Sequence, residues 1–220
     1  MTIALGILAR DGVVIAADTQ ETYGFPANAK ISGYKLLTRL IPHPPRAFCA
    51  TGAGNAGYLD ALNQELADNF EDKFEEPKAR AGIERRFEEK LRKFHTAHVL
   101  PLHVLPESQQ PSLQIIVGMN WADGESMLLA NEHSAIYRCK HFVARGLGQA
   151  HALMLLSRLL PSKPETTTEV AAFLAAYVIY QVKGYVNDCG MGTHVTLLSN
   201  GNGRHLSDGT VMKLERAFDA

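Results

Sequence analysis

The sequence is poor in cysteine and has no long hydrophobic run. Its three cysteines are too few for a disulfide framework and fit a reducing compartment. No apolar run approaches the ~18 residues that a transmembrane helix needs, and the first residues lack the basic leader of a signal peptide. These absences predict a cytoplasmic protein without a membrane partner.

The sequence also lacks an excess of either charge. It has 22 basic and 23 acidic residues, so it does not have the basic surplus on which nucleic-acid binding depends. Hydrophobic residues make up 46% and charged residues 20% of the 220 residues, which is typical of a globular protein with a sizeable core. Because no internal repeat or boundary is visible, we expect residues 1–220 to form one domain.

An Asp-Gly step near the start of the chain predicts a β-hairpin. Two short apolar runs, 3–8 and 13–17, flank Asp11-Gly12, and glycine tolerates the positive φ of a primed turn. In such a hairpin the residues near Asp18 pair with those near Thr2. The turn alone therefore brings Asp18 close to the start of the chain.

The rest of the chain alternates blocks of strands with blocks of helices. Apolar residues at helical spacing from Asn55 onward predict helices that Pro77 interrupts, and Thr166 with Glu169 forms a capping box that opens a later helix. Segregated blocks favour an α+β fold, which two packed sheets with helices outside would satisfy. Strands are expected at 35–41, 47–51, 113–118, 126–129, 136–137, 141–144 and 195–199, helices at 55–93, 150–160 and 166–186, a loop at 19–33 and a linker at 98–111.

Thr2 is a candidate nucleophile because it directly follows Met1. A free amine at Thr2 would have a pKa of roughly 7.7–8.0 and could act as the general base for its own hydroxyl. A nearby cation would favour the alkoxide, and an anion would hold that cation in place. Asp18 and Lys35 are the available pair, although small residues at position two and charges at strand ends are also common without any function.

The glycines Gly52, Gly54 and Gly57 match G-x-G-x-x-G, between a strand and a helix. The spacing fits three readings: a turn whose amides point at an oxyanion, a turn that lets a helix pack on a strand, or a dinucleotide-binding loop. The following residues are helical and contain no second strand ending in an acidic residue, which favours the first two readings over the third.

Two other groups of reactive residues carry weaker signals. Cys189 with the nearby His194 could form a thiol nucleophile, but a free cysteine is more often a small buried hydrophobe. The spacing of His95, His98 and His103 does not match a usual metal pattern. We therefore expect neither a metal nor an organic cofactor.

These pieces together resemble the proteasome family of N-terminal-nucleophile hydrolases, and in particular bacterial-type β-type subunits. Residues 2–7, TIALGI, and 11–19, DGVVIAADT, look like the opening hairpin of those subunits. Lys30 and Lys35-Leu36 resemble the lysine-bearing segment that follows, and 50–56, ATGAGNA, resembles the glycine turn before the first long helix. Weaker similarity continues through 142–148 and 189–195.

The resemblance implies a four-layer αββα sandwich and a set of residue roles. Thr2 would be the nucleophile and its α-amine the base, Lys35 would tune both groups, and Asp18 would orient Lys35. Backbone amides near Thr51 and Gly52 would form the oxyanion hole.

The chain departs from the family pattern where active members carry supporting side chains. Leu147 stands at the position of a serine. Val186 and Cys189 stand at the aspartate and serine of an Asp-x-x-Ser-Gly segment, for which Asp188 is the nearest substitute. These departures predict weak activity.

The resulting hypothesis is a threonine-type endopeptidase subunit of homo-oligomeric stacked rings. It would act on peptides or unfolded proteins, and an ATP-dependent unfoldase is a candidate partner. The alternatives are a catalytically silent or non-peptidase relative that forms rings and cleaves small amides, and a nucleotide-binding protein that uses Gly52, Gly54 and Gly57.

Overall fold

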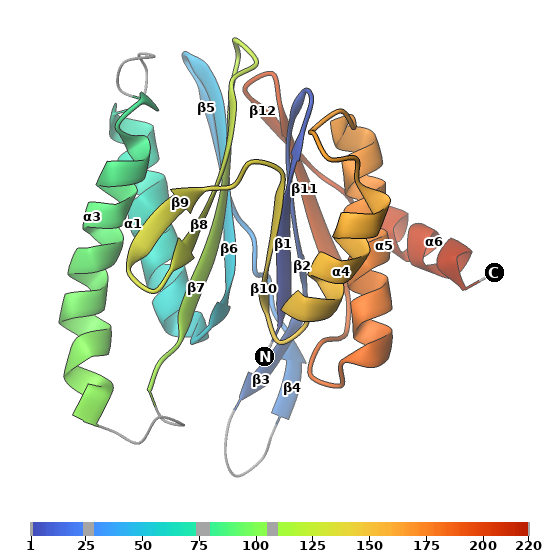
Figure 1. The fold of residues 1–220 in the computed structure, drawn as a ribbon, viewed down its shortest axis with the longest axis horizontal. Helices are drawn as coiled ribbons and strands as arrows, with labels where there is room; N and C mark the ends of the chain where they lie inside the picture. The colour runs from blue at the N-terminus through green and yellow to red at the C-terminus, as the bar shows by residue number, and fades with distance from the viewer. Residues whose placement is uncertain (1, 24–28, 74–79, 105–109, 220) are drawn as a thin grey trace.

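The computed structural model describes residues 2–23, 29–73, 80–104 and 110–219. Figure 1 shows two sheets face to face in the middle of the molecule, with helices on both outer sides. None of the described helices is long and apolar enough to cross a membrane.

The first sheet contains the amino-terminal hairpin in its centre. Its strand order is β10-β1-β2-β11-β12, and all its pairings are antiparallel. The predicted hairpin is confirmed, since Ala4 pairs with Ala17 across the turn. The strands are β1 (Ile3–Ala9), β2 (Gly12–Asp18), β10 (Phe142–Gly146), β11 (Thr193–Ser199) and β12 (Asn202–His205).

The second sheet has the order β5-β6-β7-β8-β9 and is also antiparallel. Its long central strands meet the hairpin of the first sheet across a shared core. The strands are β5 (Leu37–Pro42), β6 (Pro45–Gly54), β7 (Leu113–Trp121), β8 (Ser126–Glu132) and β9 (Ala135–Arg138).

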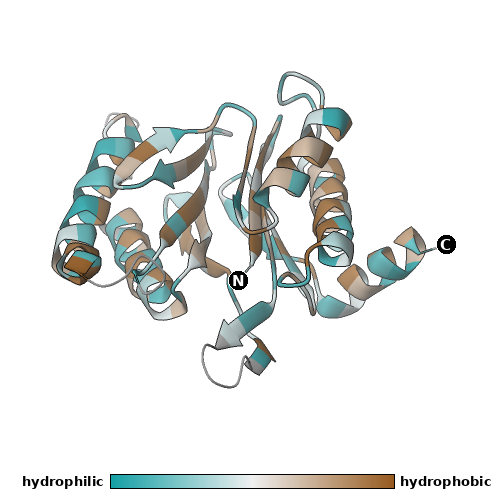
Figure 2. Ribbon diagram, turned by 60° about the horizontal axis from the view of Figure 1, so that its bottom comes forward, coloured by the Kyte–Doolittle hydropathy of each residue, from teal (hydrophilic) through white to brown (hydrophobic). Residues whose placement is uncertain are grey.

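Helices cover the outer face of each sheet. Helices α1 (Ala56–Lys73) and α3 (Ile83–Phe94) cover the second sheet, whereas α4 (Gln149–Leu159) and α5 (Thr168–Tyr185) cover the first. Helix α6 (Asp208–Phe218) packs on α5 and β11. In Figure 2 the hydrophobic colour is strong in the central strands, and the helices on both sides mix hydrophobic and hydrophilic residues. The α+β, αββα sandwich fold is thus confirmed.

The core between the two sheets is packed tightly around small residues. Gly118 in β7 faces Val13 and Ile15 of β2, and a Cβ built on Gly118 would lie 2.9 Å from a methyl or methylene carbon of each. Protein interiors are packed about as densely as organic crystals, so no space is left for an added methyl group.

We therefore expect Gly118→Ala to destabilise the fold by about 1–3 kcal/mol, the usual cost of overpacking a core. Gly184→Ala is the matched control, because nothing lies within 4 Å of a Cβ at that helical position. Urea denaturation of the two variants measures the difference. Equal midpoints for Gly118→Ala and Gly184→Ala would contradict the tight sheet–sheet contact.

The structure corrects three predicted elements and adds one helix. The expected loop at 19–33 contains a two-stranded hairpin, β3 (Gln20–Tyr23) with β4 (Ala29–Ser32). The expected linker at 98–111 begins as a π-helical turn, η1 (His95–Val99), and a 3-10 turn, η2 (Leu100–Val104).

The third correction concerns the start of α5, and the added helix is α6. Thr167, not Thr166, caps α5, because its side chain accepts a hydrogen bond from the Val170 amide. Helix α6 was not predicted, although Ser207 caps it in the ordinary way. The predicted break at Pro77 lies outside the described residues.

Candidate active site

The register of the first hairpin positions Thr2 beside Asp18. Because Ala4 pairs with Ala17, Ile3 lies opposite Asp18, and the Ile3 amide donates a hydrogen bond of 3.2 Å to the Asp18 carboxylate. Asp18 is fully buried and Thr2 is 5% exposed. The pairing of strands thus holds a threonine hydroxyl and a carboxylate together in the interior.

Lys35 completes a three-residue contact. Its Nζ donates to Asp18 Oδ1 at 2.9 Å and also to Thr2 Oγ1, and the Thr2 hydroxyl donates to the same Asp18 oxygen. A third donor contact from Nζ reaches the Gln20 carbonyl oxygen. The structure therefore brings Thr2, Asp18 and Lys35 together, as expected from the sequence, while their catalytic roles remain predictions.

The electrostatics of this contact favour a nucleophilic Thr2. An ammonium group in direct contact with a hydroxyl oxygen stabilises negative charge that develops on that oxygen. The side chain of Lys35 is 11% exposed and that of Asp18 is fully buried, so water screens the ion pair little. Asp18 compensates the charge of Lys35 and fixes its position.

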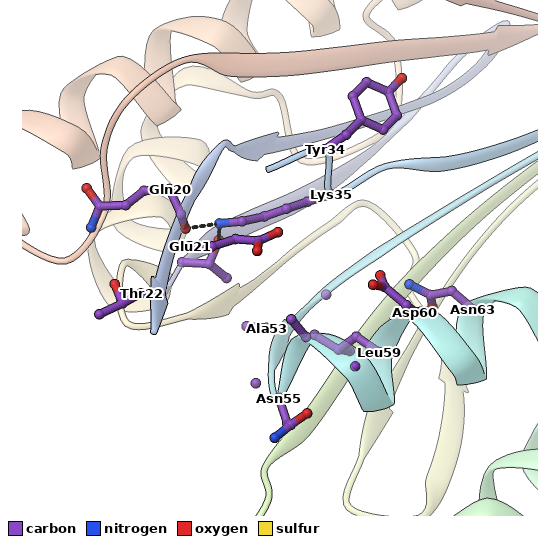
Figure 3. A pocket seen from close by; sticks show the side chains of 15 residues that line it. Gln20, Glu21, Thr22, Tyr34, Lys35, Ala53, Asn55, Leu59, Asp60 and Asn63 are labelled. Atoms are coloured by element: carbon purple, nitrogen blue, oxygen red, sulfur yellow. Dashed lines mark hydrogen bonds between the residues drawn. The ribbon is translucent and has the colours of Figure 1, made fainter. Parts of the chain in front are cut away.

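A cavity of about 680 Å³ opens over these residues. Figure 3 shows its two walls: Lys35 and Glu21 come from one side, and Leu59, Asp60 and Asn63 of α1 come from the other. Burial and the charge of Glu21 raise the pKa of Asp60. The cavity is large enough for several side chains of a ligand and has the nucleophile candidate in its wall.

The backbone at Gly52 directs an amide toward this cavity. Gly52 lies opposite Ile115 in the β6–β7 ladder. The Ile115 amide does not donate to Gly52 but to the side-chain oxygen Oδ1 of Asn131, at 2.7 Å. The Gly52–Ile115 pair is therefore a non-hydrogen-bonded pair, and the Gly52 N–H points away from β7. The neighbouring Thr51 has the opposite orientation, and it does not line the cavity whereas Gly52 does.

This geometry separates the three readings of the glycine motif. Strand β6 pairs antiparallel with both of its neighbours, whereas a dinucleotide-binding turn belongs to a parallel βαβ unit. A Cβ on Gly52 would lie 2.1 Å from the Gln114 carbonyl oxygen, so close packing also requires glycine. The oxyanion and packing readings both fit this turn.

The segment 186–190 contributes a backbone group. The Gly190 amide donates to Asp18 Oδ2 at 2.9 Å, which fixes the second carboxylate oxygen. Asp188 is half-buried, Leu147 is 53% exposed, and in the described part of the chain neither they nor Val186 and Cys189 line the cavity. Among the described residues, the side chains that hydrogen-bond to the Thr2 hydroxyl are those of Asp18 and Lys35, and none of the four expected supporting residues does so.

Several lining residues were not anticipated from the sequence. Gln20, Glu21, Tyr34, Asp60 and Asn63 line the cavity, and Gly190 reaches Asp18. The one signal that could have found some of them is helical spacing, because Ala56, Asp60 and Asn63 follow the glycine turn on one face of α1.

The buried Cys189 does not have the properties of a nucleophile. Burial, followed by the negative charge of Asp18, raises its pKa to about 12, so the unreactive thiol predominates at neutral pH. The rate at which Cys189 is alkylated should therefore rise about tenfold per pH unit from pH 7 to pH 10 without a plateau. The variant Cys189→Ala should hydrolyse any substrate of the unmodified chain at an unchanged rate. Peptide mass spectrometry after iodoacetamide treatment measures the rate. A plateau near pH 8 would contradict this.

No family model and no curated protein matches the chain. The fold is similar to solved structures of Anbu proteins. The Hyphomicrobium sp. strain MC1 Anbu, described as a Gly-1 mutant, is 17% identical with a TM-score of 0.73, and the match covers 100% of this chain and 94% of that one. For Anbu from Yersinia bercovieri, described as an ancestral beta-subunit, the identity is 11%, the TM-score 0.76 and the coverage 99% and 93%.

A third structure is described as the helical assembly of the Anbu complex from Pseudomonas aeruginosa. It is 16% identical, with a TM-score of 0.74, and the match covers 99% of this chain and 92% of that one. The chain therefore has the Anbu-like fold. The sequence-based assignment to the bacterial proteasome β-type subunits is wrong as stated, since no family model supports it and these structural neighbours are Anbu proteins.

Proposed function

We propose that the chain is a threonine peptidase with an Anbu-like fold, and that Thr2 becomes its N-terminal residue and nucleophile. The observation that carries the proposal is the position of Lys35 Nζ, which contacts both Thr2 Oγ1 and Asp18 Oδ1 at the wall of the cavity. A nucleophile with an adjacent base and a fixed cation is the arrangement that covalent hydrolysis requires.

The first half of the reaction forms an ester. The α-amine of Thr2 accepts the hydroxyl proton as Oγ1 attacks the carbonyl carbon of a peptide bond, and Lys35 stabilises the charge on Oγ1. The Gly52 amide donates to the oxyanion of the tetrahedral intermediate. Collapse breaks the C–N bond, the leaving amine takes the proton from the α-ammonium group, and the acyl group remains on Thr2.

The second half restores the enzyme. The α-amine removes a proton from a water molecule as the water oxygen attacks the carbonyl carbon of the ester. The ester C–O bond then breaks, Oγ1 recovers the proton, and a carboxylic acid product leaves. No metal or organic cofactor takes part in these steps.

We further propose that residues 1–220 act as one unit within a homo-oligomer, because both halves of the chain contribute to the site: Gly190 holds the carboxylate of Asp18. The helical assembly described for the Pseudomonas aeruginosa Anbu complex supports an oligomer of stacked subunits, of rings or a helix. Peptides or unfolded proteins are the proposed substrates, and an ATP-dependent unfoldase is a proposed partner.

A second candidate is a ring-forming relative that is catalytically silent or cleaves only small amides. The observation that favours it is the absence of Asp188, Leu147 and Cys189 from the cavity lining in the described part of the chain. Fewer hydrogen bonds to the amine and hydroxyl of Thr2 would leave the nucleophile less well oriented.

Product analysis separates these candidates. The purified assembly is incubated with casein and, separately, with a panel of small acyl amides, and the products are identified by mass spectrometry. The proposal predicts internal cleavage of casein that depends on Thr2. Turnover of the small amides alone would support the second candidate and contradict the peptidase.

A further inference from the structure

A cluster of potential metal ligands lies next to the cavity. His194 in β11, His205 in β12 and Asp208 at the start of α6 each offer one ligand atom, and these atoms lie within 4.8 Å of one another. Among the described residues, this is the one group of three or more such side chains with ligand atoms this close together. It does not include His95, His98 or His103.

The strand pairing explains why the two histidines meet. Strand β12 pairs with β11 so that His205 lies opposite Thr196, and His194 is two residues before Thr196 on the same face of β11. His194 and His205 are therefore diagonal neighbours, with ring centroids 5.4 Å apart. The chain then turns into α6, which brings Asp208 Oδ1 to 4.0 Å from His194 Nε2.

The surroundings of His205 resemble the outer shell of a metal site. Its Nδ1 lies 3.2 Å from the Thr196 hydroxyl, which leaves Nε2 available for a ligand. A hydrogen bond to the non-ligating nitrogen is how proteins orient metal-binding histidines. The other ring is already dehydrated, since the His194 side chain is 12% exposed and its Nδ1 is buried without a partner among the described residues.

Independently of the proposed peptidase activity, we propose that His194, His205 and Asp208 bind a divalent transition-metal ion of the Zn²⁺ type, with water as a further ligand. Two imidazoles and one carboxylate form a common zinc ligand set. In a tetrahedral site the ligand atoms lie about 3.4 Å apart, from metal–ligand bonds of about 2.0–2.1 Å. The distance of 4.0 Å between His194 Nε2 and Asp208 Oδ1 must therefore shorten, and the Asp208 side chain, which is 79% exposed, has room to move.

The ion would connect the cavity wall to the carboxyl-terminal helix. The ring of Tyr34 packs on both imidazoles, with centroids 4.5 Å from His194 and 5.6 Å from His205, and Tyr34 also lines the cavity beside Lys35. Binding would therefore fix α6 against β11 and β12. It would also hold in place the two imidazole rings on which Tyr34 packs.

Metal binding is tested on the untagged full-length assembly after removal of metals with a chelator. Calorimetric titration with Zn²⁺ should give one site per chain, and bound Zn²⁺ should raise the thermal midpoint. Titration with Co²⁺ should give the visible absorption of a tetrahedral ion. The variants His205→Ala and Asp208→Asn should each weaken binding at least tenfold and abolish the thermal shift.

His151→Ala is the matched control, because His151 is exposed and stacks on Tyr185 away from the cluster. It should bind Zn²⁺ as the unmodified chain does. Two results would overturn the assignment: no saturable Zn²⁺ binding by the unmodified assembly, or binding that survives the combined loss of His194, His205 and Asp208. Neither result depends on catalytic activity.

Discussion

Thr2→Ala should abolish peptide turnover, with a loss on the order of 10⁶-fold, as observed when the nucleophile of a serine hydrolase is removed. The alanine keeps the α-amine at the same place but has no oxygen to attack the substrate. It also removes the hydroxyl that contacts Lys35 and Asp18 without leaving a buried charge unpaired. The fold should therefore persist, and turnover of a fluorogenic peptide measures the loss.

Thr2→Ser is the matched control for this variant. Serine keeps both the hydroxyl and the amine, so it should retain measurable turnover, reduced because its side chain is less restricted about χ1. Thermal unfolding and assembly size should be the same for both variants. Full activity in Thr2→Ala would show that a different group carries out the reaction.

Lys35→Met should have the second largest effect, a loss of turnover on the order of 10²–10⁴-fold, comparable to the loss of a general acid–base group. Methionine has a similar length but no charge to stabilise the Thr2 alkoxide. The substitution also leaves Asp18 buried without its counter-ion, and breaking a buried pair costs about 3–5 kcal/mol of stability. Kinetics and urea denaturation measure the two effects.

A double variant separates catalysis from stability. In Lys35→Met with Asp18→Asn, the unpaired negative charge is gone, so stability should recover most of the loss while turnover remains low. Recovery of activity together with stability in the double variant would contradict a catalytic function of the Lys35 charge.

Lys35→Arg tests the shape of the cation, because the planar guanidinium cannot reproduce the contacts of one Nζ with Thr2, Asp18 and Gln20.

Local sequence rules were sufficient for the part of the site that depends on a tight turn. The Asp11-Gly12 step sets the hairpin register, and this register brings Thr2 to Asp18. No such rule placed Lys35, because the paired strands β3 and β4 lie between Asp18 and Lys35. The charge argument only named Lys35 as an available cation, and the family resemblance gave it a role beside Thr2.

Features that depend on distant pairings could not be predicted. The register of β6 against β7 decides whether the Thr51 or the Gly52 amide faces the cavity. A change of that register by one residue would exchange the N–H groups that point toward β7 with those that point away from it. The Gly190 amide reaches Asp18 across 172 positions of sequence. The His194–His205 contact likewise requires the β11–β12 pairing.

The family assignment failed for a different reason. A hairpin, a threonine after Met1 and a glycine turn indicate a fold and a possible chemistry, but they cover only a small part of the chain. The Anbu structures have a similar fold although they are only 11–17% identical to this chain, so an expected fold does not by itself identify a family.

Intact-mass spectrometry before and after treatment with an electrophile that captures an N-terminal threonine tests the central claim most directly. The account predicts a chain that begins at Thr2 and gains one adduct, located on Thr2, with no adduct in Thr2→Ala. A chain that retains a residue before Thr2, or a free Thr2 that remains unmodified, would contradict the assignment of Thr2 as an activated nucleophile.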